Sequence, residues 1–278
     1  MPNPTADLHL HTTFSDGIDA PEQVVVLARQ AGLSTIAITD HDNTEALAIA
    51  APAAQRLGLE LIPGIEMSAS TAGCEVHVLG FLFDAAHPAL KEHLKVQQAR
   101  RIRRVHQMVE QLAAVGVTIS AEEVLLQAKD GTVGRPHVAR ILIKHGYAAT
   151  NAEAFEKYLG NNGPGFVPGS PLPPKEVIGV IRAAGGVPVL AHPIYLGNDA
   201  LIDEFVRDGL AGLEVHHSSH TPEHIRHYAQ IAARLKLLVT GGSDYHGATV
   251  KEGLPIGAVK VPCQLIEAMR EWQLAHKV

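Results

Sequence analysis

The sequence predicts an α/β barrel that is interrupted by a helical insertion. Short apolar runs rich in β-branched residues alternate with helical patterns in the first and last parts of the chain, which is typical of strands joined by helices. Side chains of metal-ligand type follow several of these runs, and strand ends converge in the mouth of a barrel. A long central stretch without strand patterns indicates the insertion.

The alternation begins at the N-terminus. Apolar runs at residues 6–10 and 35–39 predict strands, and helical patterns begin at Pro21 and Thr44. Two further strands are expected near residues 59–65 and 75–81. Because strand and helix alternate, we expect a parallel sheet.

The pattern changes near Pro88, where a long polar helical stretch runs to Gly116 and further helices follow. The signals for these helices are capping-box spacing at Ser120 with Glu123 and at Thr150 with Glu153, and a proline suited to a first helical position, Pro136. We expect residues 99–168 to form a helical insert that caps the barrel mouth, and residues 1–98 and 169–278 to form the barrel.

A stretch rich in glycine and proline, residues 160–174, returns the chain to the barrel. A helical pattern begins at Lys175 and another closes the chain at residues 265–274. Between them, apolar runs at residues 187–190, 212–215 and 237–240 predict three more strands.

Composition limits the class of protein. With 278 residues, of which 46% are hydrophobic, the chain can bury a full core. Cys74 and Cys263 stand far apart, and we find neither an apolar run long enough to span a bilayer nor a leader sequence, so we expect a soluble cytoplasmic protein. A net charge of -6 provides no general attraction for long nucleic acid.

Histidine and carboxylate side chains recur at the predicted strand ends. Asp7, His9 and His11 share one face of their strand, because residues two apart point the same way. Two imidazoles at this spacing can bind one ion, although such a pair alone is more often incidental. The other candidate ligands are Asp16, His41, Glu66, His77, His192, Asp244 and His246.

Each candidate has an ordinary structural explanation when it is considered alone. Asp16 lies in a Ser-Asp-Gly turn, where aspartate is common, and a histidine in an apolar strand such as His77 is more often a satisfied core residue. The joint pattern is stronger, because nine donors follow separate strands. Nine exceed the needs of one ion, so we expect two or three divalent ions. Nitrogen and oxygen ligands without a thiolate favour manganese, with iron or zinc as alternatives.

These motifs resemble those of the PHP (polymerase and histidinol phosphatase) family of metal-dependent phosphoesterases. They are DLHLHTTFSDG, TDHD, the region of Glu66 and His77, and His192 with SDYH. The resemblance implies a distorted, TIM-like (β/α)7 barrel. It also implies three ion sites: His9, His11, Glu66 and Asp244; Glu66, His77 and His192; and Asp16, His41 and His246. Asp40 and Asp42 would then orient histidines.

This ligand set predicts phosphoester hydrolysis. Two ions bridged by Glu66, about 3.5–4 Å apart, can hold a hydroxide for in-line attack on phosphorus. Glu66 and Asp244 are therefore the expected catalytic carboxylates, and His217 is our hypothesis for the proton donor. The competing interpretation is that the histidine-rich segment around His217 forms a polar loop and a solvated helix face. That segment contains His216, His217, His220, His224 and His227.

The insert contains a predicted substrate-binding loop, GTVGRPH at residues 131–137. Backbone N–H groups at the following helix start and the guanidinium of Arg135 could bind a phosphate apart from the ions. Ser15, Lys157 and His217 are further substrate-binding candidates, although Lys157 on a helical pattern is more often solvated. The aromatic candidates for stacking on a base, or for ordinary packing, are Tyr158, Phe166 and Tyr195.

Two phosphate sites suit a nucleotide with two phosphates. RPH within a helical insert resembles the nucleoside 3',5'-bisphosphate phosphatase branch of the family, which implies conversion of adenosine 3',5'-bisphosphate to AMP and phosphate. The main alternative is 5' to 3' cleavage of short 5'-phosphorylated RNA, with Arg135 at the terminal phosphate. Histidinol phosphate hydrolysis, C–N bond hydrolysis and a degenerate metal-binding module explain the full set of features less well. We expect no membrane partner and infer no protein partner.

Overall fold

The computed structural model describes residues 4–71, 74–129, 131–169, 172–248 and 254–276. Its centre is one eight-stranded sheet in the order β7-β6-β5-β4-β3-β2-β1-β8. The sheet curls into a nearly closed barrel, because the end of β1 also meets the segment after β7, where His11 N donates to Tyr245 O at 2.9 Å. The strands are β1 Thr5–Leu10, β2 Thr35–Ile38, β3 Glu60–Thr71, β4 Cys74–Phe81, β5 Val187–Leu190, β6 Gly212–His217, β7 Leu238–Gly242 and β8 Val261–Pro262.

The barrel is mixed rather than parallel throughout. β1, β2 and β3 pair in parallel, as do β5, β6 and β7, but β4 runs antiparallel to both β3 and β5. Only two residues separate β3 from β4, which is too short for the crossover helix that a parallel pair needs. The short strand β8, which the sequence pattern did not indicate, adds antiparallel to β1. The α/β barrel is confirmed, and the expectation of an all-parallel sheet is wrong at these two strands.

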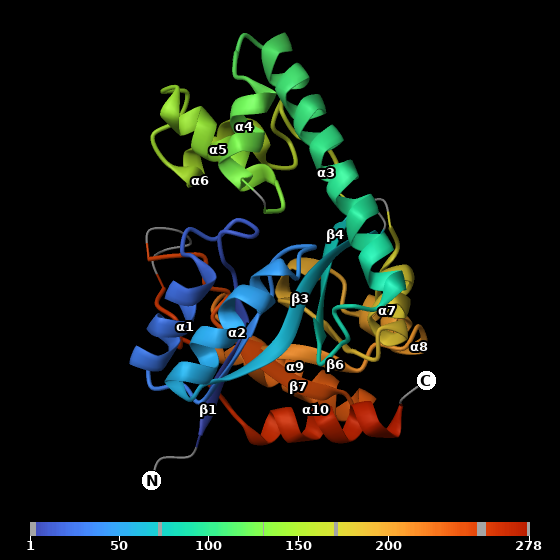
Figure 1. Cartoon of the computed structure of the whole chain (residues 1–278). Helices are drawn as coiled ribbons and strands as arrows, with labels where there is room; N and C mark the ends of the chain where they lie inside the picture. The colour runs from blue at the N-terminus through green and yellow to red at the C-terminus, as the bar shows by residue number, and fades with distance from the viewer. Residues whose placement is uncertain (1–3, 72–73, 130, 170–171, 249–253, 277–278) are drawn as a thin grey trace.

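Helices surround the barrel and extend beyond it (Figure 1). The helices are α1 Pro21–Gln30, α2 Glu45–Leu57, α3 Pro88–Ala114, α4 Ala121–Ala128, α5 Arg135–Lys144, α6 Asn151–Ala154, the π-helix η1 Phe155–Leu159, α7 Pro174–Ala183, the 3-10 helix η2 Pro193–Leu196, α8 Ala200–Arg207, α9 Pro222–Leu235 and α10 Gln264–Ala275. No helix among the described residues is both long and apolar enough to cross a membrane.

The central helices pack around a hydrophobic cluster of their own. Met108 and Leu112 of α3 contribute to it together with Val124 of α4 and Leu142 of α5. In Figure 1, α4, α5 and α6 lie above the barrel, and the long helix α3 connects them to it. Since α3 runs unbroken through residue 99, the proposed boundary of the insert falls inside a helix. The division into a barrel and a capping insert stays a prediction.

The expected capping boxes form only in part. Ser120 Oγ accepts from Glu123 N at 3.4 Å and Thr150 Oγ1 accepts from Glu153 N at 3.2 Å, as an N-cap should. The glutamate side chains do not accept a hydrogen bond from the backbone N–H of Ser120 or Thr150. Glu123 pairs instead with Lys144 of α5, and Glu153 accepts from the backbone N–H of Ala149. Pro136 lies at the second position of α5.

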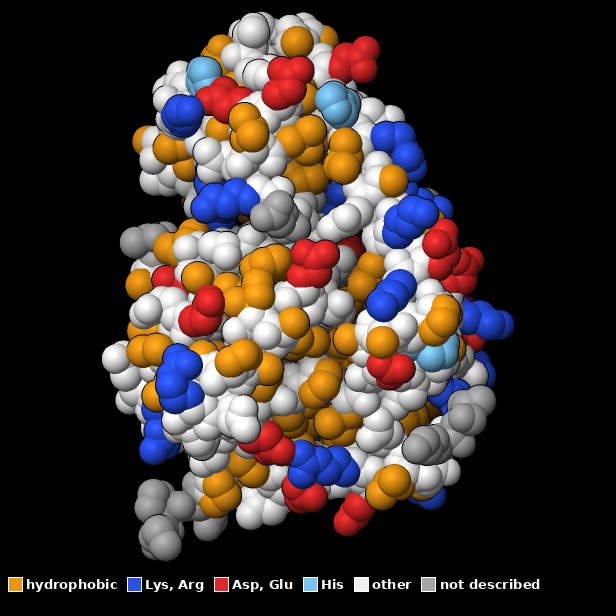
Figure 2. All heavy atoms as spheres, in the orientation of Figure 1, with side chains coloured by type: hydrophobic (Ala, Val, Ile, Leu, Met, Phe, Trp, Pro, Cys, Tyr) orange, Lys and Arg blue, Asp and Glu red, His pale blue; other side chains and the backbone are white. Residues whose placement is uncertain are grey.

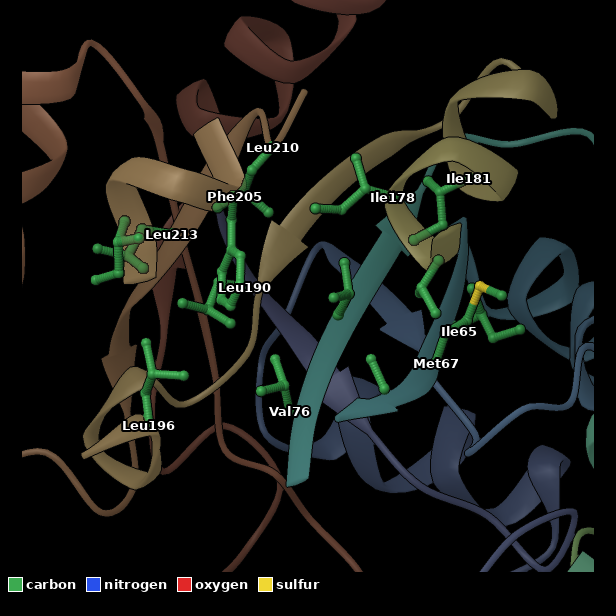
Figure 3. Close-up of a cluster of buried hydrophobic side chains, with 14 of the residues drawn as sticks. Ile65, Met67, Val76, Ile178, Ile181, Leu190, Leu196, Phe205, Leu210 and Leu213 are labelled. Atoms are coloured by element: carbon green, nitrogen blue, oxygen red, sulfur yellow. The ribbon is translucent and has the colours of Figure 1, made fainter. Parts of the chain in front are cut away.

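One side of the barrel core is formed by β3, β4 and β5 against α7 and α8. Figure 3 shows Ile65 and Met67 of β3 beside Ile181 of α7, and Phe205 beside Leu190. The helix approaches the sheet closely at Gly80, where an added Cβ would lie 3.2 Å from Ile181 Cγ1. A small residue in β4 therefore allows α7 to seat Ile181 against the strand that carries His77.

We expect Ile181→Ala to destabilise the protein by about 2–5 kcal/mol, because it leaves a cavity in a close-packed core. Ile181 is 1% exposed. The midpoint and slope of urea unfolding would measure the change. Leu274→Ala on α10 is the control, since its side chain is 73% exposed and should contribute less than about 0.5 kcal/mol. Equal effects of the two substitutions would contradict this account of the core.

Candidate active site

The candidate ligands meet at one end of the barrel, although they come from six separate strands and the loops that follow them. β1 and the residue after it carry His9 and His11. His41 follows β2, His192 follows β5, and Asp244 and His246 follow β7. β3 and β4 contribute from within their own length, because they continue past the ends of their neighbours. The groups whose donor atoms lie within 4.8 Å of one another are His9, His11, Glu66 and Asp244; His11, Asp16, His41 and His246; His41, Glu66 and His77; and His9, Glu214 and His217.

Glu66 lies at the centre of this cluster and is 1% exposed. Its Oε1 is 2.8 Å from His77 Nδ1 and 2.9 Å from His192 Nε2. Its Oε2 is 3.2 Å from His9 Nε2 and 3.1 Å from His11 Nε2. Oε1 thus faces His77 and His192, and Oε2 faces His9 and His11, with His41 Nδ1 also 3.3 Å from Oε2.

Asp244 completes the group that contains His9 and His11. Its Oδ1 lies 3.5 Å from His9 Nε2 and 3.2 Å from His11 Nε2. The backbone of Asp244 has φ +53°, and that of His192 has φ +26°, both in the left-handed region that non-glycine residues rarely adopt. Such strain is typical of functional positions, because the surrounding fold must hold it in place.

A third group surrounds Asp16. Its Oδ1 is 3.1 Å from His246 Nε2, and its Oδ2 is 3.8 Å from His41 Nε2. All three side chains enter from loops that follow strands, and Asp16 and His246 are almost fully buried. The structure therefore brings together all nine residues that the sequence indicated.

The donor set fits divalent cations. His11 Nε2, Asp16 Oδ1 and His41 Nδ1 are buried and face other donor atoms of the cluster at 3.1–3.3 Å, without the geometry of a hydrogen bond. Buried polar atoms without partners are costly, and a cation would satisfy them. Burial alone would raise the pKa of Glu66, but His41, His77 and His9 together lower it well below its usual value. The cluster thus holds an ionised carboxylate in a buried position.

Asp40 supports the cluster indirectly. It accepts from Thr12 N at 2.7 Å and from Ser15 Oγ at 2.6 Å, and Ser15 Oγ lies 3.3 Å from His11 Nδ1. Asp40 therefore orients His11 through the hydroxyl of Ser15. Because Ser15 is 1% exposed and engaged in this way, its hydroxyl faces the supporting network, and a contact with substrate stays a prediction.

Asp42 does not orient a histidine, contrary to expectation. It accepts from the backbone N–H of Ser68 at 3.0 Å and pairs with Arg101 of α3 at 2.8 Å. Arg101 also donates to Ser68 Oγ and to the carbonyl of Val133. Asp42 thus fixes α3 and the segment before α5 against the barrel.

Glu214 is a member of the site that the sequence analysis missed. It is fully buried in β6, where its Oε1 accepts from His9 Nδ1 at 2.9 Å and its Oε2 accepts from His192 N at 2.8 Å. A carboxylate in this position fixes the tautomer of His9 so that Nε2 faces Glu66. The signal available was a lone glutamate inside the apolar run GLEV.

His217 lies in the ligand cluster, whereas other histidines of the same segment have separate contacts outside it. Its Nδ1 accepts from Ser219 N at 3.1 Å, so the neutral ring carries its proton on Nε2, which lies 3.3 Å from Asp244 Oδ2. His220 is bonded to the carbonyl of Val215, and His227 is exposed and pairs with Asp199. The solvated-face interpretation is therefore correct for His227 and wrong for His217.

Arg135 faces a cavity of about 1000 Å³ that also contains His41, His77 and His192 in its lining. Its Nη2 lies 2.6 Å from Glu75 Oε2, and its guanidinium is 5.8 Å and 5.9 Å from the ring centroids of Phe155 and Phe166. Arg135 is thus held by one carboxylate and two aromatic faces, opposite the ligand cluster.

Of the other substrate-binding and stacking candidates, only some line the cavity that Arg135 faces. Phe166 and Tyr195 line the same cavity, and Tyr195 is 58% exposed. Tyr158 packs against the cluster of the central helices. Lys157 is exposed on η1, where it pairs with Glu153 at 2.5 Å, and it is not among the described residues that line this cavity. Its contact with substrate stays a prediction.

A barrel mouth lined by histidines and carboxylates is typical of a hydrolase of the metal-dependent phosphoesterase class. The family model for the PHP domain matches residues 7–140. The protein is 37% identical over 247 residues to the 5'-3' exoribonuclease Rnm of Salmonella typhimurium, covering 86% of this chain and 84% of that protein. The chain therefore belongs to the PHP family.

Two further similarities bear on the activity. The protein is 35% identical over 246 residues to a 3',5'-nucleoside bisphosphate phosphatase of Chromobacterium violaceum, covering 86% of each chain. A crystal structure of a metal-dependent phosphoesterase from Bifidobacterium adolescentis superposes with a TM-score of 0.90 at 35% identity, covering 100% of this chain and 98% of that one. Phosphoesterase chemistry is common to these relatives, whereas their substrates differ.

Proposed function

We propose that this hydrolase removes the 3'-phosphate from nucleoside 3',5'-bisphosphates, such as adenosine 3',5'-bisphosphate, to leave AMP and phosphate. The observation that supports this substrate is the position of Arg135, which faces the ligand cluster across one cavity. A ligand with two phosphates can place one in the cluster and the other against the guanidinium. The similarity to the phosphatase of Chromobacterium violaceum supports the same choice.

We propose three ion sites, which the contacts above support: His9, His11, Glu66 and Asp244; Glu66, His77 and His192; and Asp16, His41 and His246. Divalent ions bound there, which we propose to be manganese, would activate water and neutralise charge on the phosphoryl oxygens. Glu66 would hold two sites at a fixed separation, because each of its oxygens faces a different histidine pair. Glu214 would keep His9 in the tautomer that the first site needs.

We further propose that His217 takes up the proton that the attacking water loses and passes it, from the imidazolium, to the leaving alkoxide, which returns the ring to its neutral form. Its Nε2–H is directed at Asp244, so the carboxylate would hold the ring in place until the alkoxide forms. Because His217 is 3% exposed, the proton would be transferred inside the cluster rather than exchanged with bulk solvent.

Stepwise 5' to 3' cleavage of short RNA is the second candidate. It would use the same cluster, and it is supported by the similarity to the exoribonuclease of Salmonella typhimurium. The cavity of about 1000 Å³, with Phe155, Phe166 and Tyr195 in its lining, is large enough for a nucleotide and offers rings for stacking on a base.

A substrate panel tests this proposal. We expect manganese-loaded protein to release phosphate from adenosine 3',5'-bisphosphate at least about tenfold faster, in kcat/KM, than from AMP or histidinol phosphate, because each charge-assisted contact of Arg135 is worth about 1.5–3 kcal/mol. Protein that has been treated with a chelator is the control. Equal rates on all three substrates would contradict the specificity, and full activity after chelation would contradict the metal chemistry.

A further inference from the structure

A second cavity, the arginine cavity, has a volume of about 260 Å³ and lies beside α3, where four arginines line it. Arg103 and Arg104 follow Arg100 by three and four residues, so the three occupy one face of the helix, and Arg101 lies next to them. Figure 2 shows Lys and Arg side chains along the α3 edge of the molecule, at the right of the view. Only two of the described lining residues are carboxylates, so the lining carries an excess of two positive charges.

The two carboxylates are engaged mainly with other arginines. Asp42 is committed to Arg101, from which it accepts at 2.8 Å. Glu75 lies closer to Arg135 of α5, at 2.6 Å, than to Arg104, at 3.8 Å. The other guanidinium groups on this face of α3 therefore have little compensation for their charge.

Arg104 keeps an unused donor in the part of the chain that the structure describes. Its Nε donates to the carbonyl of Val167 at 2.9 Å, but its Nη2 is buried and has no hydrogen-bond partner among the described residues. Burial, with smaller contributions from Arg135 and Arg101, lowers the pKa of Arg104 to about 10, and Glu75 offsets this shift only in part. A buried donor without a partner is costly, and an anion in the cavity would satisfy it.

Arg100 and Arg103 complete the basic side of the cavity. Arg103 is exposed and forms no ion pair with another described residue, and Arg100 donates to the side-chain oxygen of Gln97 at 3.4 Å. Gln97 and Gln107 also line the cavity, whereas none of its described lining residues is aromatic. The lining thus offers guanidinium and amide donors, and no ring on which a base could stack.

The arginine cavity is separate from the ligand cluster. None of the nine candidate metal ligands is among the described residues that line it. An added Cβ at Gly169 would lie 2.8 Å from Glu75 Oε1, so the chain passes directly against this carboxylate between the arginine cavity and the cavity of about 1000 Å³. An anion beside α3 therefore has its own set of protein contacts.

We propose that Arg100, Arg103 and Arg104 bind one inorganic phosphate ion in the arginine cavity, at a site separate from the ligand cluster. A phosphate group carries about 1.5–2 negative charges at pH 7, which matches the excess positive charge of the lining. Its oxygens can accept from several guanidinium groups at once, and arginine is especially suited to such recognition. A lining without aromatic rings, among the residues described, disfavours a nucleotide. Because none of the candidate metal ligands takes part, this site does not depend on the proposed hydrolysis.

Equilibrium dialysis of the manganese-loaded full chain against radiolabelled inorganic phosphate tests the site. R100A/R103A should bind one phosphate fewer per chain than the natural protein, or bind it at least about tenfold more weakly, because charge-assisted contacts to phosphate are lost. The difference should persist after treatment with a chelator. The kcat/KM for adenosine 3',5'-bisphosphate should change less than twofold, since neither arginine is among the described residues that line the cavity of about 1000 Å³.

The matched control is R29A/R56A, which removes two exposed arginines in the last turns of α1 and α2, outside the described lining of the arginine cavity. It should bind phosphate like the natural chain, and circular dichroism would establish that both double variants fold. Equal phosphate binding by R100A/R103A and the natural chain would overturn the proposal. A difference that disappears after chelation would overturn it too, because the phosphate would then lie in the ligand cluster. The same holds for equal displacement by chloride at matched ionic strength, because the attraction would then be diffuse.

Discussion

Glu66→Gln should reduce kcat/KM by at least about 10³-fold, because a bridging carboxylate fixes two ions whose combined contribution to catalysis is several kcal/mol. Glutamine keeps the shape of the side chain but replaces one oxygen by an amide nitrogen, which cannot bind a cation. Since the two oxygens of Glu66 face His77 and His192 on one side and His9 and His11 on the other, one of the two sites must lose a ligand. Fewer manganese ions per chain should be found by elemental analysis of the purified variant.

The matched control lies on the same strand. Glu60→Gln changes the first residue of β3, at the opposite end of the barrel, where the side chain is half-exposed and pairs with Arg270. We expect it to retain activity and metal content. Circular dichroism would establish that both variants fold. A Glu66→Gln protein that keeps its full ion content and most of its activity would remove Glu66 from the bridging position.

The nine candidate ligands were predictable because most of them lie at or near the ends of recognisable strand patterns. His41, His192 and Asp244 come within a few residues of the ends of apolar β runs, and a chain that alternates strand and helix brings such positions to one end of a barrel. The PHP motifs then indicate which donors belong together. Glu66 lies close to the histidines of that grouping, but His41 Nδ1 also lies 3.3 Å from Glu66 Oε2, and the division into ion sites stays a proposal.

Long-range packing could not be predicted in the same way. Glu214 is an isolated glutamate in a strand pattern, and its role depends on where β6 lies relative to His9, 205 residues away in sequence. Similarly, the pairing of Asp42 with Arg101 depends on how α3 crosses the barrel mouth, which helical periodicity does not specify. β4 was predictable only in part. Its strand pattern was visible in the sequence, but its antiparallel direction depends on the short link to β3.

The second large expected effect concerns Arg135, the proposed anion clamp. Arg135→Ala should raise the KM for adenosine 3',5'-bisphosphate by about 10–100-fold, since a charge-assisted contact to phosphate contributes about 1.5–3 kcal/mol. The KM for adenosine 3'-monophosphate should rise far less, and kcat should change little for either substrate. Lys144→Ala, an exposed residue at the other end of α5 that pairs with Glu123, is the control. A uniform loss on both substrates would mean that Arg135 serves only to hold the loop.

Part of that loss would come from Glu75, and a double-mutant cycle separates the two contributions. The guanidinium of Arg135 lies 2.6 Å from Glu75 Oε2, whereas the nearest contact of Arg104 to the same carboxylate is 3.8 Å. Removing Arg135 therefore leaves the Glu75 carboxylate with only the 3.8 Å contacts of Arg104 and His77, at the place where the second phosphate would bind. Adding Glu75→Gln to the Arg135→Ala variant should lower its raised KM several-fold. The Glu75→Gln single variant should bind the bisphosphate at least as tightly as the natural chain. Additive effects of the two substitutions would show that Arg135 and Glu75 act independently, and the clamp would then owe its specificity to the guanidinium alone.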